Sequence, residues 1–334
     1  KRKILSNEFY SNVTKDCDKF TSQMGYITDS SSQEEKDFPI AFGILVFKDL
    51  DQVERLLRAI YRPHNVHCIH IDSKSSIEFY MALKSIVSCL PNVWIASKHV
   101  DVRWGTFTVL EPEIVCLREL YAHKTKWRYY INLTGQEFPL KTNYELVKIL
   151  KSYQGANNIL GQTQLYAHKT KWRYYINLTG QEFPLNSNRV DPKNPPPHNI
   201  KVCKGSVHMT ASRAFIHYVL FNQTAQDFLK WSKNMSVPDE SFFTSLNNNP
   251  HLKVPGSYID NKRQELSRYK IWYNTKRCRS GHLYRSICIF GMADLPILTT
   301  KPQLFANKFH YEFEPLAYDC LELWYRRKIN KELK

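Results

Sequence analysis

"FPIAFGILVFKDLDQVERLLRAIYRPHNVHCIHID", residues 38–72, is the stretch that decides the fold of this chain. It opens on an apolar run that is typical of a strand buried on both faces. Apolar residues then recur at helical spacing over 49–61, and Pro63 ends that pattern. Residues 65–72 predict a second buried strand. A strand, a helix and a strand in this order predict a right-handed crossover between parallel strands.

The same alternation continues along the chain. Further helices are expected at 75–90 and 113–121, and further strands at 92–97 and 127–133. Later in the chain we expect a strand at 205–212 and helices at 213–221 and 225–232. These elements predict an α/β fold, a Rossmann-type, mostly parallel sheet flanked by helices in a single domain. Ligands of such sheets bind beyond the carboxyl ends of the strands.

The outer segments differ in composition from this central region. Residues 1–37 are polar and are expected to be a stem or linker remnant, and residues 329–334 a basic tail. The folded domain would then span 38–328. The chain opens on KRK without a methionine, so we expect a fragment whose targeting or anchoring segment lies further upstream. No apolar run within it is long enough for a signal peptide or a membrane-spanning helix.

Charge and cysteine content limit the kind of partner and compartment. The chain of 334 residues has a formal net charge of +16, which favours an anionic partner: nucleic acid, nucleotide phosphates, acidic glycans or a membrane surface. Its 8 cysteines include no CxxC pair, so we expect disulfides in an oxidising compartment rather than a metal site. Glycosylation sequons agree with this and begin at Asn12, Asn132, Asn177, Asn222 and Asn234. Asn132 falls in a predicted buried strand and is expected to stay unmodified.

Several catalytic signatures are missing from the sequence. It contains no GxGxxG and no GxxxxGK[ST], which would indicate a dinucleotide site or a P-loop. It also lacks HExxH and GxSxG, the signatures of zinc proteases and α/β-hydrolases. The segment "DLD" at Asp49–Asp51 resembles a metal-binding DxD, but acids are common at the start of a helix. We interpret His64, His67 and His70 as structural residues and expect no metal site.

The segment "SVPDESFF" combines a helix start with two carboxylates. Ser236 would be the N-cap, and Asp239 and Glu240 would complement the helix dipole in the first turn. The functional alternative is a general base whose pKa is raised by partial desolvation beside Phe242 and Phe243.

Two cations stand next to strongly apolar, strand-like runs. These are Arg285 in "YRSICIFGMADL" and Lys308 in "LFANKFHYEF". Solvated surface charge would account for each of them. The alternative is a diphosphate site, because Arg offers a fork of donors and Lys a compact charge.

Ordered segments of the chain resemble a known family. They include "FPIAFGILVFKD", "SCLPNVWIASK", "WRYYINLTGQEFPLKTNYELV", "WSKNMSVPDESFF", "RSICIFGMADL" and "LFANKF". Over residues 17–155 and 196–328 they are similar to the β-1,6-N-acetylglucosaminyltransferases that make core 2 and I branches, in glycosyltransferase family 14. The resemblance implies a Golgi type II membrane enzyme with a GT-A-like lumenal domain, here 38–328. It also implies inverting transfer of GlcNAc from UDP-GlcNAc to a galactose or GalNAc 6-hydroxyl, without a metal, so that side chains neutralise the leaving UDP.

The resemblance assigns roles to individual residues. Glu240 would be the base that deprotonates the acceptor hydroxyl, and Arg285 and Lys308 would hold the diphosphate. The uridine and sugar pocket would be lined by Leu45, Val46, Phe47, Asp72, Ser73 and Lys74, together with Trp104 where the family usually has tyrosine. Trp272 would lie against the acceptor sugar. Asn274 replaces a tyrosine of core 2 members or an acid of I-branching members.

The resemblance also implies a cysteine pairing. The implied disulfides are Cys17–Cys89, Cys68–Cys116 and Cys278–Cys288. Cys320 matches a cysteine whose partner lies in an upstream stem, so in this chain it is either free or paired with Cys203.

One segment occurs twice, since residues 120–140 and 165–185 are identical. The identity stops abruptly at both ends, which excludes a repeat protein of the solenoid type. Family-like sequence flanks the first copy, so we expect it to form the native fourth strand. The second copy stands where relatives carry a variable basic, acceptor-binding segment. We predict that it forms an irregular or edge-packed excursion, with no central parallel strand at Tyr174–Leu178.

Several functions remain open at this point. The leading hypothesis is core 2-type β-1,6 branching of O-glycans, with UDP-GlcNAc as donor and no cofactor. I-branching of poly-N-acetyllactosamine is the nearest alternative. A catalytically impaired homologue that binds UDP without recognising an acceptor is another, because of the duplication. A basic module that binds glycans or nucleic acid is the last; we expect no nucleic-acid partner.

Overall fold

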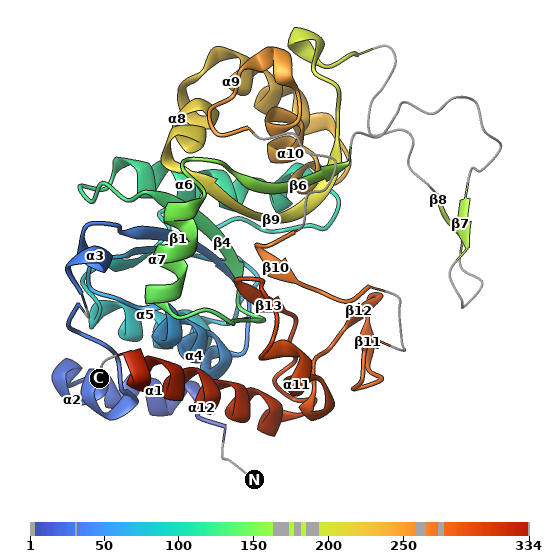
Figure 1. Ribbon diagram of the computed structural model, residues 1–334. Coiled ribbons are helices and arrows are strands. Elements are labelled where there is room, and N and C mark those ends of the chain that lie inside the picture. The colour runs from blue at the N-terminus through green and yellow to red at the C-terminus, as the bar shows by residue number, and fades with distance from the viewer. Residues whose placement is uncertain are drawn as a thin grey trace.

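A computed structural model describes residues 4–30, 32–162, 174–176, 182–184, 194–257, 265–272 and 277–332. Its central feature is a six-stranded sheet in the order β3-β2-β1-β4-β9-β6 (Figure 1). The strands are β1 (Ile40–Val46), β2 (Val66–Ile71), β3 (Val93–Ile95), β4 (Tyr129–Thr134), β6 (Asn158–Gln162) and β9 (Lys204–Ser212). The first four are parallel, and β9 is antiparallel to both of its neighbours. The predicted α/β fold with a mostly parallel sheet is confirmed.

Helices cover both faces of this sheet. One face carries α4 (Leu50–Ile60), α5 (Ile77–Ser88) and α7 (Asn143–Ser152), whose apolar residues form one core with β1 and β2. The second core is formed by α6 (Glu111–Ala122), α8 (Arg213–Phe221), α9 (Gln223–Trp231) and α10 (Phe242–Asn247). Because β1 and β2 are buried along almost their whole length, their sequences read as apolar runs without alternation.

The centre of the sheet depends on one close approach. A Cβ atom at Gly43 of β1 would collide with the hydroxyl of Tyr130 on β4. That hydroxyl donates a hydrogen bond of 2.7 Å to the carboxyl of Glu113 on α6. Burial raises the pKa of Glu113 to about 8. Glu113 is therefore mostly protonated at neutral pH, as suits a carboxyl inside an apolar core.

A smaller group of strands and helices lies beside the six-stranded sheet. It contains the three-stranded sheet β10-β13-β5, formed by Arg268–Tyr269, Phe305–Asn307 and Glu137–Pro139. It also contains the hairpin β11 (Leu283–Tyr284) and β12 (Ile287–Cys288), and the helices α11 (Leu295–Leu298) and α12 (Pro315–Glu332). Figure 1 shows α12 as the long red helix at the bottom of the molecule, and it lies against α4. Arg55 of α4 fixes this position, because its buried guanidinium pairs with Asp319 at 2.7 Å and with Glu322 at 2.6 Å.

The polar N-terminal segment contributes to the core. It forms α1 (Asn7–Val13), α2 (Cys17–Met24) and α3 (Gln33–Lys36). Tyr10 and Phe20 are both fully buried. At the other end, Ile329 in the expected tail region is buried as part of α12. The short 3₁₀ helices are η1 (Phe107–Val109), η2 (Pro197–Asn199), η3 (Ser232–Asn234), η4 (Pro238–Glu240), η5 (Pro250–Leu252) and η6 (Met292–Asp294).

The two identical segments have different structures. The first copy forms β4 and β5, which belong to two different sheets. In the second copy, β7 (Tyr174–Ile176) pairs with β8 (Glu182–Pro184) as a separate antiparallel two-stranded sheet. The described part of Tyr174–Leu178 is therefore no central parallel strand, as predicted, while residues 177–178 lie outside the described residues.

Two of the implied disulfides are present, Cys17–Cys89 and Cys278–Cys288. The third differs from the prediction, because Cys68 on β2 and Cys116 on α6 are free, buried thiols. Their sulfur atoms are 2.6 Å apart, so the two cysteines of the implied pair lie side by side. Cys203 and Cys320 are also free, the first buried and the second exposed. The alternative in which Cys320 pairs with Cys203 is therefore not realised.

The sequon asparagines differ in exposure. Asn12, Asn222 and Asn234 are exposed. Asn132 is buried, as expected, and donates to the carbonyl oxygen of Val207 at 2.7 Å. Asn177 lies outside the described residues. Among the helices that the structure describes, none is both long and apolar enough to span a membrane.

Candidate active site

A pocket opens at the carboxyl ends of β1 and β2. It has a volume of about 230 Å³, and its lining includes Leu45, Val46, Phe47 and Asp72 of the predicted donor site. His70 lines it as well, and its ring also accepts a hydrogen bond from the backbone of Val100. The pocket lies where parallel sheets generally bind ligands. Four of the six residues predicted from the ends of the first two strands thus line one cavity.

Lys74 is held by its neighbours and lies outside the lining of this pocket. Its ammonium group is 2.8 Å from Asp72, 3.0 Å from Asp101 and 2.7 Å from the carbonyl oxygen of Val102. Ser73 donates its backbone N–H to the carbonyl of Val100. Lys74 instead lines an adjacent pocket of about 580 Å³, which shares Phe47–Asp49 with the first. Lys74 therefore fixes the loop after β2 through Asp72 and Asp101.

Glu240 lies in a 3₁₀ turn rather than in the first turn of an α-helix. Ser236 caps no helix, because Val237 follows it in the left-handed region with φ of 50° and η4 begins at Pro238. The expected N-cap at Ser236 is therefore wrong. Phe242 and Phe243, the expected apolar neighbours of Glu240, are buried in the second core. Phe242 stacks there on Phe228.

The turn that carries Glu240 packs against the loop that carries Trp104. The backbone N–H of Val237 donates to the carbonyl oxygen of Gly105 at 2.9 Å. Trp104 itself is 80% exposed. Two predicted site residues that are far apart in the sequence are thus held on neighbouring segments, with the indole of Trp104 free of protein packing.

Lys204 and Lys270 lie near Glu240, and Trp272 lies beside Lys270. The Lys204 ammonium nitrogen is 4.0 Å from the Glu240 carboxylate. Lys270 lies close enough for electrostatic attraction to Glu240, while burial lowers its pKa. The Lys270 ammonium also lies 5.2 Å from the ring centroid of Trp272, which is 46% exposed. An exposed indole offers an apolar face on which a sugar can lie. Asn274 lies outside the described residues.

Arg285 and Lys308 come together on the ring of Tyr284. The Lys308 ammonium is 4.7 Å from the ring centroid, and the Arg285 guanidinium carbon is 5.5 Å from it. Burial, and then the charge of Arg285, lower the pKa of Lys308 to about 8. The two positive charges repel each other, and a bound anion would reduce this repulsion. The two cations are a pair and not isolated surface charges.

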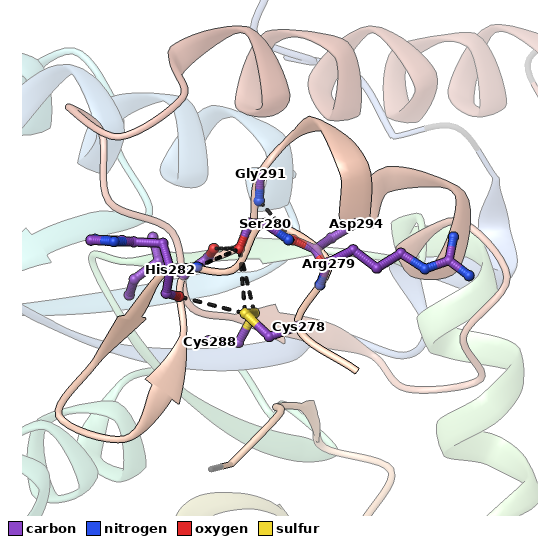
Figure 2. The surroundings of a disulfide bond; sticks show 8 residues. Cys278, Arg279, Ser280, His282, Cys288, Gly291 and Asp294 are labelled. Atoms are coloured by element: carbon purple, nitrogen blue, oxygen red, sulfur yellow. Dashed lines mark hydrogen bonds between the residues drawn. A yellow bond between two sulfur atoms is a disulfide. The ribbon is translucent and has the colours of Figure 1, made fainter. Parts of the chain in front are cut away.

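The hairpin that carries Arg285 is anchored at its base, as Figure 2 shows. The disulfide Cys278–Cys288 closes it. The carboxylate of Asp294 accepts backbone N–H groups from Arg279 at 2.9 Å, from Ser280 at 3.2 Å and from Gly291 at 3.0 Å. A covalent bond and three hydrogen bonds thus restrict the position of Arg285 relative to Lys308.

A buried ion pair, Glu137 with Arg268, was not predicted from the sequence. Both side chains are fully buried, and the Arg268 Nε is 2.6 Å from the Glu137 carboxylate. Glu137 also accepts from Asn307 at 3.1 Å, and Arg268 donates to the carbonyl of Asn132 on β4. The pair joins the six-stranded sheet to β5, β10 and β13. The last of these strands ends at Asn307, directly before Lys308. In the sequence, Glu137 and Arg268 appear only as one charged residue within each of two strand-like runs. Charged residues exposed to solvent give the same pattern, so the pair could not be predicted.

One strand pairing links Trp272 to the hairpin that carries Arg285. Trp272 forms an antiparallel bridge with Ile287 of β12. Through Lys270, which lies beside Trp272 and attracts Glu240, this pairing connects the segments that carry the predicted site residues. This arrangement offers a base, a sugar-binding surface and a site for a doubly charged leaving group.

Comparison with known proteins identifies similar sequences over most of the chain. The sequence model of the Core-2/I-Branching enzyme family matches residues 40–298. The human "N-acetyllactosaminide beta-1,6-N-acetylglucosaminyl-transferase" is 36% identical, with 93% of this chain and 78% of that protein covered. A zebrafish (Danio rerio) "Beta-1,3-galactosyl-O-glycosyl-glycoprotein beta-1,6-N-acetylglucosaminyltransferase 4" is 38% identical, covering 92% and 74%. A bovine (Bos taurus) protein named "Beta-1,3-galactosyl-O-glycosyl-glycoprotein beta-1,6-N-acetylglucosaminyltransferase" is 35% identical, covering 100% and 80%.

Proposed function

Because this chain belongs to the Core-2/I-branching enzyme family, we propose that it transfers GlcNAc from UDP-GlcNAc to a sugar 6-hydroxyl. The acceptor would be a galactose or GalNAc in an O-glycan, giving a core 2-type β-1,6 branch. The observation that best supports this proposal is the strand bridge between Trp272 and Ile287. It joins the side of the site that carries Glu240 to the hairpin that carries Arg285.

The proposed chemistry is one direct displacement. Glu240 takes the proton of the acceptor 6-hydroxyl, and that oxygen attacks C1 of GlcNAc from the side opposite the diphosphate. The bond between C1 and the phosphate oxygen breaks, so the configuration at C1 inverts. Arg285 and Lys308 stabilise the negative charge that develops on the leaving UDP, and no metal is required.

An assay with a matched pair of variants tests this proposal. We expect turnover of UDP-GlcNAc with Galβ1-3GalNAc, unchanged by EDTA. Glu240→Gln should lower kcat by about 10²–10⁴-fold, because the amide cannot accept the proton. Glu34→Gln is the control, since Glu34 forms an exposed pair with Lys151 at 2.6 Å, away from the proposed site. Loss of turnover in EDTA, or full activity of Glu240→Gln, would contradict the proposed mechanism.

The acceptor could instead be poly-N-acetyllactosamine, which corresponds to I-branching. The human relative is named for an N-acetyllactosaminide acceptor, while the zebrafish and bovine relatives are named for a β-1,3-galactosyl-O-glycosyl-glycoprotein. Parallel assays on both acceptors decide between the two, by the larger kcat/KM.

An impaired homologue is the second candidate function. It is favoured by the duplicate segment, since β7 and β8 pair only with each other and join no other sheet of the described chain. Such a protein would bind UDP and show no transfer to either acceptor. Equilibrium binding of UDP together with a turnover assay separates this candidate from the active enzyme.

We further propose that the protein works in the Golgi lumen, attached to the membrane by an anchor upstream of residue 1. Two disulfides and the exposed sequon residues Asn12, Asn222 and Asn234 suit the oxidising secretory pathway. Endoglycosidase treatment of the protein expressed in animal cells tests this, because removal of N-glycans would lower its mass. An unchanged mass would count against passage through that pathway.

A further inference from the structure

Three basic side chains, not two, lie against the ring of Tyr284. The ammonium of Lys308 and the guanidinium carbon of Arg285 are 4.7 Å and 5.5 Å from its centroid. The imidazole centroid of His310 is 4.8 Å from the same centroid, with the rings inclined at 65°. The proposed function uses Arg285 and Lys308 and gives His310 no role.

His310 lies next to the wall of the donor pocket. Phe309, between Lys308 and His310, donates its backbone N–H to the carbonyl oxygen of Gln136 at 2.9 Å. Gln136 is part of the lining of the 230 Å³ pocket. This hydrogen bond fixes the segment that carries both basic residues at the edge of that pocket.

The surroundings of His310 keep its imidazole neutral while no anion is bound. Burial, followed by the charges of Lys308, His282 and Lys48, lowers the pKa of His310 to about 4, and Glu312 opposes this. Its Nε2 has no hydrogen-bond partner within the described parts of the chain. A proton can therefore be added at Nε2 without breaking an existing hydrogen bond.

We propose that His310 becomes the third cation of the diphosphate site, gaining a proton when a nucleoside-diphosphate sugar binds. A bound diphosphate brings two negative charges that offset the repulsion from Lys308 and Lys48, which favours the protonated imidazole. The proton comes from the solvent, and no covalent bond changes. This inference rests on the proposed donor site and adds proton uptake to it.

Binding calorimetry with UDP-GlcNAc tests the inference directly. Each phosphate of this ligand carries one permanent charge, so the ligand takes up no proton itself near pH 6. Titrations at about pH 6 in two buffers of different ionisation enthalpy should show uptake of up to about one proton per site. If the bound imidazole has a pKa of about 6, the affinity should be about tenfold higher at pH 5 than at pH 7. His310→Gln should remove the uptake and leave a pH dependence of less than about twofold.

His282→Gln is the matched control. The ring of His282 stacks on Phe313 with centroids 4.3 Å apart, so this histidine has a separate partner. The control variant should keep the proton uptake. Histidine NMR of the wild-type protein gives a second readout, because the resonance of one imidazole should move to its protonated position when ligand is added.

The outcomes separate this inference from the proposed function. Binding of UDP-GlcNAc without proton uptake would overturn the role of His310 and leave the donor site intact. Uptake that persists in His310→Gln, or disappears in His282→Gln, would do the same. If the wild-type protein bound no UDP-GlcNAc at all, the proposed donor site would fail and this inference with it.

Discussion

Lys308 is the residue whose ionisation gives the proposed donor site its upper pH limit. Burial and the neighbouring Arg285 lower its pKa to about 8 from the ordinary lysine value of 10.5. A lysine with a lowered pKa keeps its charge below that value and loses it as the pH rises through it. The site therefore loses one of its fixed charges in mildly alkaline solution.

The affinity for UDP-GlcNAc should follow this charge. We expect it to stay level between about pH 7 and pH 8 and to fall by up to about tenfold per pH unit above that. Lys308→Arg should keep a level affinity throughout this range, because an arginine stays protonated. Equilibrium titrations from pH 7 to pH 10 measure both profiles. A decline that began only near the ordinary pKa of lysine would contradict the proposed environment of Lys308.

Residue-scale predictions from the sequence were uneven. Arg285 and Lys308 were singled out as cations beside apolar runs, but only the family resemblance assigned them a diphosphate role, which stays a prediction. Their shared contact with Tyr284 could not be predicted, since it depends on how the hairpin lies over the end of β13. The turn at Glu240 was misjudged for a different reason. Val237 adopts a left-handed conformation that is rare for a β-branched residue, so a standard helix start was expected.

At the scale of elements, the pair Glu137–Arg268 connects the two sheets. Burial raises the pKa of Glu137, and the charge of Arg268 is the largest influence that lowers it. Because both groups are fully buried, removal of one leaves an uncompensated charge on the other.

Arg268→Met should therefore destabilise the protein by about 3–5 kcal/mol at pH 7. The penalty should be smaller at about pH 5 than at pH 7, because burial raises the pKa of Glu137 and a carboxyl that gains a proton as the pH falls costs less to bury. Urea unfolding at both pH values, with disulfides intact, measures this. The double variant Glu137→Gln, Arg268→Met is the control and should recover part of the loss. Equal destabilisation at both pH values would refute the assigned electrostatic cause.

The elements of the first half were predictable and those of the second half were less so. β1, β2 and β4 are buried on both faces, so their apolar runs mark them clearly. The strands β10 to β13 have two or three residues each, too few for any periodic pattern. The helices before residue 37 bury a few separated side chains, among them Tyr10, Phe20 and Met24, so this polar segment looked like a linker.

At the scale of the whole molecule, the duplicate segment is an addition to a complete sheet. All six strand positions of that sheet are filled without β7 and β8. A long surface insertion costs little free energy beyond closing a longer loop. The six-stranded fold should therefore not depend on the second copy.

Deletion of residues 165–185 should change the midpoint of thermal unfolding by only about 2–4 °C. We expect this because the deletion removes no strand of the six-stranded sheet. Calorimetric or circular dichroism melting curves of the two proteins measure the shift. A loss of more than about 10 °C would show that the second copy contributes to the core. Acceptor assays on the same protein show in parallel whether the segment obstructs activity.

The two identical copies also have a consequence for folding. What distinguishes the first copy is its flanks, where the Glu119 carboxylate accepts from Trp94 at 2.9 Å and Thr142 forms a capping box with Glu145. At the same places beside the second copy, Gln164 stands for Glu119, Ser187 for Thr142 and Val190 for Glu145. During folding, the second copy can therefore compete with the first for the β4 position between β1 and β9. Because both copies belong to one chain, dilution does not lower the effective concentration of the competitor. Any misfolded fraction that arises from this competition should be independent of protein concentration, unlike aggregation.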